Sequence, residues 1–416
     1  MKNSDILSRH ASSLDDRIRN LIDDEKLDLW ERITSADDGT STHEDEKGNN
    51  DAAEMLVDVV HSDGSPICQV PFTVEKLLRY AKQGKDCKET AAVSPASEKH
   101  AHDRRHKKPR RLKRCGSISL ELSGLKQTVT CSCNTFVRDY VPVAQWLLLT
   151  FLRGVASREN QRHLVGVAGP AGAGKSFLSK FLLKLINEMW SMCCEMVLNE
   201  RPSVDICVVL GMDAYHFTNS VLESRSVPAE FKHQLPVDTA EGTLKDIKGS
   251  EPSIDAERLH QDLSRILNSA EVISLPEYDR NLHDPVDGKI HVDPDNKIVI
   301  IEGLYLLHGC RSTNFSFADE TCRWSRISND LDSCIFLDIS EGESRHRVVE
   351  RKVKSGLTEE QATERYDRND LRILRRVHQG KSGADILLEY SSDTDETVSK
   401  LVGCTCQVDA YRQRQK

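Results

Sequence analysis

The chain contains the stretch Gly169-Pro170-Ala171-Gly172-Ala173-Gly174-Lys175-Ser176. An apolar run at 164–168 precedes it and predicts a buried strand, and an amphipathic pattern at 175–197 follows it and predicts a helix. The glycines permit backbone conformations that turn successive N–H groups to the inside of a tight loop. The stretch therefore predicts the strand–turn–helix opening of an α/β domain.

This spacing is the phosphate-binding pattern G-x-x-x-x-G-K-S. The inward N–H groups and the positive end of the following helix suit phosphate, Lys175 suits the β- and γ-phosphates, and the Ser176 hydroxyl suits Mg²⁺. A glycine-rich turn without a ligand is the alternative, which the strand–helix context disfavours. We expect ATP to be bound by Gly169, Pro170, Ala171, Gly172, Ala173, Gly174, Lys175, Ser176 and Phe177.

Apolar strands and amphipathic helices alternate from residue 140 onward, which is typical of a parallel sheet with crossover helices. We expect an α/β fold of the P-loop NTPase class with helices on both faces of the sheet. The expected strands are 164–168, 206–211, 272–275, 297–301, 334–338 and 386–388, and the expected helices are 175–197, 255–267, 343–354 and 358–377.

Two acidic residues follow predicted strands, and ligands bind at the carboxyl edge of such sheets. Asp213 follows the strand at 206–211 and is a candidate base for a hydroxyl that accepts a phosphoryl group. Glu302 follows the strand at 297–301 and is a candidate Mg²⁺ group together with Ser176. Helix capping is the alternative for both acids.

The loop after residue 275 carries aromatic and polar side chains that suit an acceptor pocket. Tyr278, Asp279 and His283 are candidates for stacking on an acceptor and for hydrogen bonding to it. The alternative is that these residues only form the end of a hairpin. Tyr215 and His216, next to Asp213, complete the expected acceptor-binding set.

A predicted helix carries Arg345, Arg347 and Arg351. Arg347 and Arg351 are four residues apart and share a face, so they are candidates to close over the transferring phosphate. A solvated charged face is the alternative.

Residues 1–136 are expected to form a partly disordered extension, and residues 137–416 the catalytic domain. Composition favours a solvated or partner-binding tail for residues 1–50, although Ile18, Leu21, Ile22, Leu27 and Trp30 could share a helix face. Runs at 55–60 and 67–70 predict a hairpin before a helix-like stretch at 74–81, and runs at 118–122 and 128–133 predict further strands.

The 416 residues include 57 Lys and Arg and 66 Asp and Glu, a net charge of −9 that disfavours a protein dedicated to nucleic acid. The basic run at 104–114 stays open as a nuclear-import signal, a polyanion site or a solvated linker. The 13 scattered cysteines and the acidic opening favour a reducing compartment, hence the cytoplasm or, through the basic run, the nucleus. No membrane segment is expected, and a homodimer is left open.

The 139–388 region resembles the P-loop kinases grouped as phosphoribulokinase, uridine kinase and pantothenate kinase. The resemblance rests on the glycine-rich stretch, on Asp213-Ala214-Tyr215-His216, on Pro276-Glu277-Tyr278-Asp279 with His283, and on the stretch from Gly356 to Asp370, which is similar to a uridine kinase-like bacterial branch. It implies a kinase-type fold, with ATP and Mg²⁺ as cofactors, Asp213 as the base, and Tyr278 and His283 around a nucleobase. Ala214 and the residues Arg372 and Ile373 depart from the patterns of that family.

The expected function is transfer of the ATP γ-phosphate to a hydroxyl of a small metabolite, first of all a nucleoside. Pantothenate or a sugar is the alternative acceptor. A nucleotide-hydrolysing switch or scaffold that acts through the N-terminal extension is the rival from another class, and a degenerate kinase that only binds is disfavoured by the intact Lys175, Ser176 and Asp213.

Overall fold

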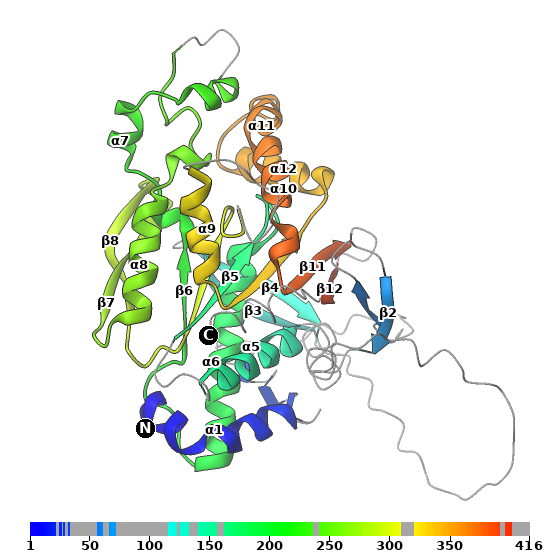
Figure 1. Cartoon of the computed structure of the whole chain (residues 1–416). Coiled ribbons are helices and arrows are strands. Elements are labelled where there is room, and N and C mark those ends of the chain that lie inside the picture. The colour runs from blue at the N-terminus through cyan, green and yellow to red at the C-terminus, as the bar shows by residue number, and fades with distance from the viewer. Residues whose placement is uncertain are drawn as a thin grey trace, which may run out of the picture.

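The computed structural model of the chain describes residues 1–21, 25–26, 28–29, 32–33, 56–60, 66–71, 115–122, 125–132, 140–155, 162–235, 241–308, 320–391 and 396–401. Its centre is a six-stranded sheet in the order β12-β11-β10-β5-β9-β6 (Figure 1). Five strands are parallel and β12 is antiparallel to β11 at one edge. The strands are β5 (His163–Ala168), β6 (Cys207–Gly211), β9 (Ile298–Gly303), β10 (Ser333–Asp338), β11 (Ile386–Ser391) and β12 (Glu396–Leu401). The predicted parallel sheet is confirmed.

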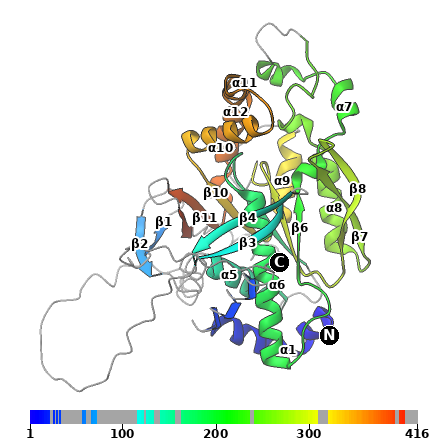
Figure 2. The same cartoon turned by 180° about the vertical axis from the view of Figure 1, so that it is seen from behind.

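Helices cover both faces of the sheet, as predicted, and Figure 2 shows the same two layers from behind. Side chains alternate between the two faces along each strand. On β5, Val165 and Val167 join one apolar cluster and Leu164 and Ala168 join the other. The first cluster contains residues of α1 (Asn3–Arg19), α5 (Val141–Val155) and α6 (Lys175–Leu198), and the second contains residues of α8 (Ala256–Asn268), α9 (Glu320–Asp330) and α12 (Leu371–His378).

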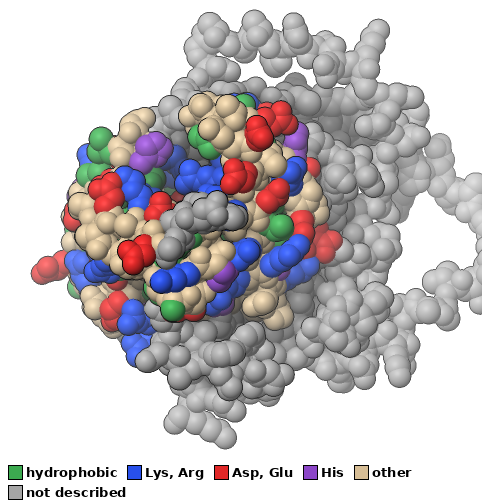
Figure 3. Space-filling view, turned by 90° about the horizontal axis from the view of Figure 1, so that it is seen from above, with side chains coloured by type: hydrophobic (Ala, Val, Ile, Leu, Met, Phe, Trp, Pro, Cys, Tyr) green, Lys and Arg blue, Asp and Glu red, His purple; other side chains and the backbone are tan. Residues whose placement is uncertain are grey.

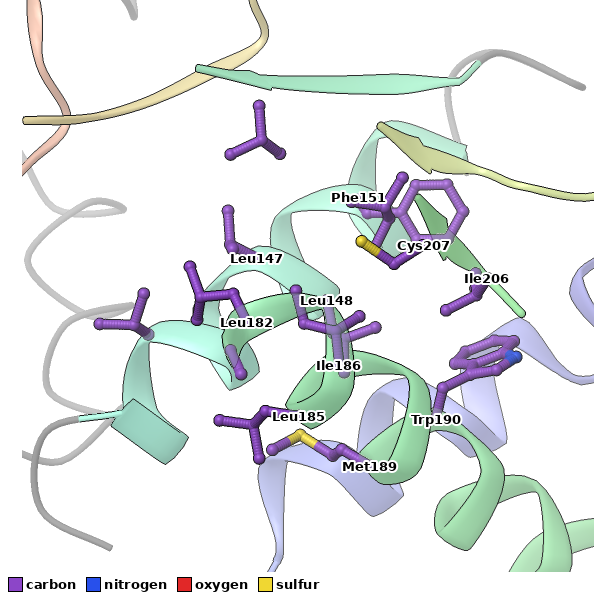
Figure 4. Packing of buried hydrophobic residues seen from close by; sticks show 14 of the residues in the cluster. Leu147, Leu148, Phe151, Leu182, Leu185, Ile186, Met189, Trp190, Ile206 and Cys207 are labelled. Atoms are coloured by element: carbon purple, nitrogen blue, oxygen red, sulfur yellow. The ribbon is translucent and has the colours of Figure 1, made fainter. Parts of the chain in front are cut away.

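The contact between α5 and α6 anchors the helix that follows the glycine-rich turn. Leu147, Leu148 and Phe151 of α5 lie together with Leu182 and Ile186 of α6 (Figure 4). All five side chains are at most 1% exposed. Because close packing leaves little freedom to shift, α6 holds its N-terminal end in a fixed place beside the sheet.

The strand predicted at 272–275 does not belong to the parallel sheet. It is part of β7 (Ile273–Asp279), which pairs antiparallel with β8 (Asp284–Val292) in a separate two-stranded sheet. Ile273 and Leu275 are buried in the cluster that contains α8, whereas Ser274 between them is exposed. One apolar face is enough for a hairpin that covers a helix, so the assignment of this run to the main sheet was wrong.

A smaller lobe lies beyond the carboxyl edge of the sheet, at the top of Figure 1. Its own apolar cluster includes Leu222 of α7 (Asn219–Ser224), Phe231 and Ile247. The helices α10 (Glu341–Lys354) and α11 (Glu359–Arg365) lie at the same end. The helix predicted at 358–377 is interrupted, because a π-helical turn at Tyr366–Asp370 separates α11 from α12.

The first helix of the chain is part of the core. Ile6, Leu14 and Ile18 of α1 are fully buried with residues of α5 and α6, so the expectation of a solvated tail is wrong for α1. The predicted hairpin exists as β1 (Leu56–Val60) with β2 (Pro66–Pro71), and the two further predicted strands exist as β3 (Cys115–Leu122) and β4 (Leu125–Ser132), which pair with each other as a second hairpin. Ile22, Leu27, Trp30, the stretch 74–81 and the basic run 104–114 lie outside the described residues.

None of the helices in the described part of the chain combines the length and apolarity that a bilayer crossing needs.

Candidate active site

The glycine-rich turn runs from β5 to α6 in the conformation that its sequence predicts. A side chain at Gly169 would lie 2.6 Å from the carbonyl oxygen of Leu337, so the turn approaches β10 too closely for any other residue. Gly174 has a φ of +90° immediately before α6, which L-residues rarely adopt. The Nζ atom of Lys175 donates to the carbonyl oxygen of Pro170 at 3.0 Å. The Lys175 side chain therefore folds back over the turn, with its charge above the backbone.

Glu302 lies beside the start of α6. It is the last residue but one of β9, which is paired with β5 on one side and with β6 on the other. The hydroxyl of Ser176 donates to its Oε1 atom at 2.8 Å. Burial and the nearby Asp213 carboxylate raise the pKa of Glu302, although Lys175 opposes them. Glu302 is thus a buried acid close to a second carboxylate, and a bound cation would stabilise its charged form.

Asp213 lies in a 3-10 turn (Met212–Tyr215) directly after β6. Its side chain is 38% exposed, and its Oδ2 atom is 3.5 Å from a guanidinium nitrogen of Arg280. Burial favours the neutral acid, but the charges of His216, Arg280 and Lys175 outweigh it and lower the pKa of Asp213. Asp213 is therefore a carboxylate at neutral pH.

A pocket opens between α6, the ends of β6 and β9, and the β7–β8 hairpin. Its lining includes Ser176 and Glu302, which contact each other, Asp213 and Arg280, which contact each other, and Tyr278. The remaining lining residues are Lys180, Val209, Gly211, Ala214, Glu277 and Ile290. A small molecule in this pocket would contact both Asp213 and the start of α6.

Two of the three predicted arginines belong to this neighbourhood. Arg347 donates to the carbonyl oxygen of Gly172 at 3.4 Å and to Glu343 at 2.6 Å. Burial and the nearby charge of Arg280 lower the pKa of Arg351, while Asp213 opposes them. Arg345 instead forms an ion pair with Asp367 at 3.1 Å, on another side of α10. Figure 3 looks onto this end of the molecule, where basic and acidic side chains are intermixed.

The residues Ser176 and Glu302 fit a magnesium ion by their donor chemistry. A hydroxyl and a carboxylate are hard oxygen ligands, and Mg²⁺ in kinases is usually held by one or two such groups together with phosphates and water. Among the described residues no cluster of three or more His, Cys, Asp or Glu side chains could hold a metal alone. A site of this kind relies on the nucleotide to complete it.

The expected acceptor-binding residues are only partly brought together. Tyr278 lines the pocket, and the ring of His216 lies 5.7 Å from the Tyr278 ring. Tyr215 does not reach the pocket, because its buried hydroxyl donates to Asp262 of α8 at 3.1 Å. The side chain of Asp279 accepts from two backbone N–H groups of the hairpin turn, and His283 is an exposed residue of that turn with a φ of +53°.

Phe177 stacks on Phe181 at a ring distance of 6.0 Å and packs against the core.

Several residues of the site were not predicted. Arg280 follows Tyr278 on the hairpin, and Lys180 lies one helical turn after Ser176. Ser344 of α10 donates to the carbonyl oxygen of Ala171 at 2.8 Å, and the hydroxyl of Tyr366 lies 3.1 Å from the Ser344 hydroxyl. The four-residue spacing between Ser176 and Lys180 is a sequence signal that could have indicated Lys180.

A parallel sheet with this glycine-rich turn, and acids at the two neighbouring strand ends, defines a P-loop kinase. No family model matches the chain. "Putative uridine kinase C227.14" of Schizosaccharomyces pombe is 31% identical over 236 residues, which are 56% of this chain and 85% of that protein. "Uncharacterized protein YggC" of Escherichia coli is 28% identical over 276 residues, 66% of this chain and 96% of that protein.

"Pantothenate kinase" of Halalkalibacterium halodurans is 25% identical over 242 residues, which are 56% of this chain and 65% of that protein. The chain belongs to the phosphoribulokinase, uridine kinase and pantothenate kinase family of P-loop kinases. The resemblance drawn from the sequence is confirmed.

Proposed function

We propose that the protein transfers the γ-phosphate of ATP to a hydroxyl group of a small metabolite that binds between Asp213 and Tyr278. The observation that carries the proposal is the position of Asp213, an ionised carboxylate in the same pocket as Ser176 at the start of α6. A base so placed can receive the proton of an acceptor hydroxyl.

In the proposed mechanism Lys175 and the N–H groups of the turn bind the triphosphate. Ser176 and Glu302 would hold Mg²⁺, which neutralises part of the phosphate charge when bound. The acceptor oxygen forms a bond to the γ-phosphorus while the bond from that phosphorus to the β,γ-bridging oxygen breaks. The acceptor proton passes to Asp213, and ADP retains the electron pair of the broken bond. Arg347 and Arg351 would offset the charge on the transferring group.

A nucleoside is the first acceptor that the family resemblance suggests, and the name of the S. pombe relative points the same way. The position of Tyr278 in the pocket wall suits stacking on a base. Pantothenate and sugars stay the alternatives, because His283, expected beside a base, is an exposed turn residue. We place the reaction in the cytoplasm or the nucleus on sequence grounds only.

The test is ADP production by the purified chain with Mg·ATP and a panel of nucleosides, pantothenate and sugars. Lys175→Ala is the blank, because it removes the cation that binds the terminal phosphates. A large rate increase with one acceptor, absent from the blank, supports the proposal. Slow ADP release that no acceptor changes would favour the nucleotide-dependent switch instead.

A further inference from the structure

The turn of the β7–β8 hairpin carries an arginine that faces the candidate base. Arg280 is the first residue of this turn, directly after β7, and it lines the pocket together with Ser176 and Glu302. Its guanidinium group is 3.5 Å from the Oδ2 atom of Asp213. The proposed reaction uses Asp213 but assigns no role to Arg280, so the position of Arg280 beside the base needs an explanation.

The backbone of the turn is held in place, whereas the Arg280 side chain has room to move. Asp279 accepts from two backbone N–H groups of the turn, and the carbonyl oxygen of His283 accepts from Lys248 at 2.7 Å. The Arg280 side chain is 42% exposed, and its contact with Asp213 is longer than the roughly 2.7–2.9 Å of a strong charged hydrogen bond. Exposed ion pairs of this kind are weak. A more highly charged anion within reach could therefore replace Asp213 as the partner of Arg280.

Arg280 lies close to the cations that the proposed function assigns to the phosphates. Burial lowers the pKa of Lys175, and the charges of Arg351 and Arg280 lower it further, while Glu302 and Asp213 oppose them. The charge of Arg280 also adds to the effect of burial on the pKa of Arg351. Because such effects weaken with distance, the three cationic side chains, from α6, α10 and the hairpin turn, converge on one region.

A γ-phosphate at this edge of the sheet would meet negative charge. The pocket lining contains three carboxylates, those of Asp213, Glu277 and Glu302, and two cations, Lys180 and Arg280. Glu302 is the candidate magnesium ligand, so its charge is offset when the metal is bound. The charge of Asp213 would still repel a γ-phosphate that approaches an acceptor beside it. Arg280, a cation in contact with Asp213, is placed to offset both charges.

We propose that Arg280 is a further catalytic residue, which leaves Asp213 when ATP binds and contacts the γ-phosphate. The inference rests on the proposed function. A guanidinium group can donate two parallel hydrogen bonds to phosphate oxygens, whereas its contact with Asp213 is a single one at 3.5 Å. Asp213 then has an oxygen available for the acceptor hydroxyl. Arg280 forms and breaks no covalent bond, and it offsets the charge on the phosphoryl group while this group moves to the acceptor oxygen.

The rival explanation is that Arg280 is a permanent partner of Asp213 and never contacts the nucleotide. The two explanations differ once the charge of Asp213 is removed. A permanent partner acts through Asp213 alone, so Arg280→Met should not change nucleotide affinity in a chain that already carries Asp213→Asn. A direct contact with the γ-phosphate should keep its effect in that chain.

The experiment measures the affinity of the full chain for ADP and for AMPPNP, a non-hydrolysable analogue of ATP, with Mg²⁺ present. Both nucleotides displace a fluorescent ADP analogue. The chain is used as wild type and as Arg280→Met, Arg280→Lys, Asp213→Asn and the combination of Arg280→Met with Asp213→Asn. ADP production with the panel of nucleosides, pantothenate and sugars is then measured for the wild type and for both Arg280 variants.

Arg258→Met is the matched control for both measurements. Arg258 of α8 forms an ion pair with Asp287 of the same hairpin, and its side chain is 43% exposed, close to the 42% of Arg280. It lines a separate groove with Gln261. An effect that follows from the loss of any arginine in contact with the hairpin would therefore be seen in both variants.

We expect Arg280→Met to lower the affinity for AMPPNP about 10- to 30-fold and that for ADP by less than about twofold, because one charged donor to the γ-phosphate is lost. The loss should persist beside Asp213→Asn. Arg280→Lys should recover part of it, because an ammonium group keeps the charge but not the two parallel bonds. With the preferred acceptor, Arg280→Met should lower kcat about 10²- to 10³-fold, and Arg258→Met should resemble wild type throughout.

Equal changes for AMPPNP and ADP would overturn the contact with the γ-phosphate, and so would a loss that disappears beside Asp213→Asn. Wild-type kcat in Arg280→Met would overturn the catalytic role. If no acceptor stimulates ADP production although both nucleotides bind, the proposed function fails and the catalytic role fails with it. A selective loss of AMPPNP affinity would still support the contact itself in that case, which separates the two failures.

Discussion

Asp213 shows how charge balance at a single residue decides what it can do. A partly buried carboxylate tends to become neutral, but Arg280 at 3.5 Å and the nearby Lys175 and His216 keep it ionised. An ionised acid beside a hydroxyl can accept its proton, whereas a neutral acid cannot. The proposed role of Asp213 as base thus depends on its cationic neighbours.

We predict that Asp213→Asn lowers kcat about 10²- to 10⁴-fold, the usual worth of a general base, and leaves ATP affinity nearly unchanged. The measurement is steady-state ADP production together with binding of a fluorescent ATP analogue. Asp205→Asn is the matched control, because Asp205 precedes β6 and is at the opposite end of that strand from Asp213. Wild-type turnover in Asp213→Asn would show that another group takes the proton.

Part of the candidate site could be predicted from single residues and part could not. The positions of Lys175, Asp213 and Glu302 follow from motif spacing and from the rule that parallel strands end at one edge. Their roles stay predictions. The direction of the Tyr215 side chain depends on how its 3-10 turn packs on α8, which no local pattern records.

Two elements, the glycine-rich turn and α10, are connected by a pair of buried hydroxyl groups. Ser344 of α10 is fully buried and donates to the carbonyl oxygen of Ala171. The hydroxyl of Tyr366, in the π-helical turn, is 3.1 Å from the Ser344 hydroxyl and 3.2 Å from the carbonyl oxygen of Glu341. Single π-helical turns occur often at functional sites. This turn places a hydroxyl against Ser344, and Ser344 in turn contacts the glycine-rich turn.

We predict that Tyr366→Phe raises the KM for ATP a few-fold and lowers the free energy of unfolding by about 1 kcal/mol, the net worth of one hydrogen bond. The reason is that Ser344 loses the partner that orients its own bond to the turn. Kinetics at varied ATP and urea unfolding measure the two effects. Tyr140→Phe is the comparison, because the Tyr140 ring packs against Phe181 of α6 rather than against Ser344. A KM shift of the same size in both variants would contradict a specific link.

The elements themselves were largely predictable, and the exceptions have a common cause. Strands buried on both faces, such as β5, have continuous apolar runs that mark a parallel sheet. The run that begins β7 has a similar composition but is buried on one face only. Its partner β8 is rich in polar residues and was not predicted. Tertiary contacts with the neighbouring helix decide that this segment forms a separate hairpin. A short apolar run alone does not distinguish such a hairpin strand from a strand of the main sheet.

At the scale of the whole molecule, the most distant parts of the sequence meet in one core. Composition suggested a tail at the N-terminus, because charged residues dominate it. A few apolar side chains on one face of α1 are enough to pack it against α5 and α6. The average composition of the segment does not show so few apolar residues. Asn3 strengthens the contact through three hydrogen bonds, to Val204, Asp295 and Trp190.

We predict that Asn3→Ala lowers the free energy of unfolding by about 2–4 kcal/mol. Asn3 is completely buried, and its loss would leave the indole N–H of Trp190 and two backbone carbonyl groups without their partner in the core. Urea unfolding of the full chain gives the value. Ser8→Ala is the control on the same helix, because the Ser8 hydroxyl makes an exposed bond to Asp5 and should matter by less than about 0.5 kcal/mol. If both variants unfold like wild type, the hydrogen bonds of Asn3 contribute no net stability, and the buried apolar side chains of α1 alone account for its contact with the core.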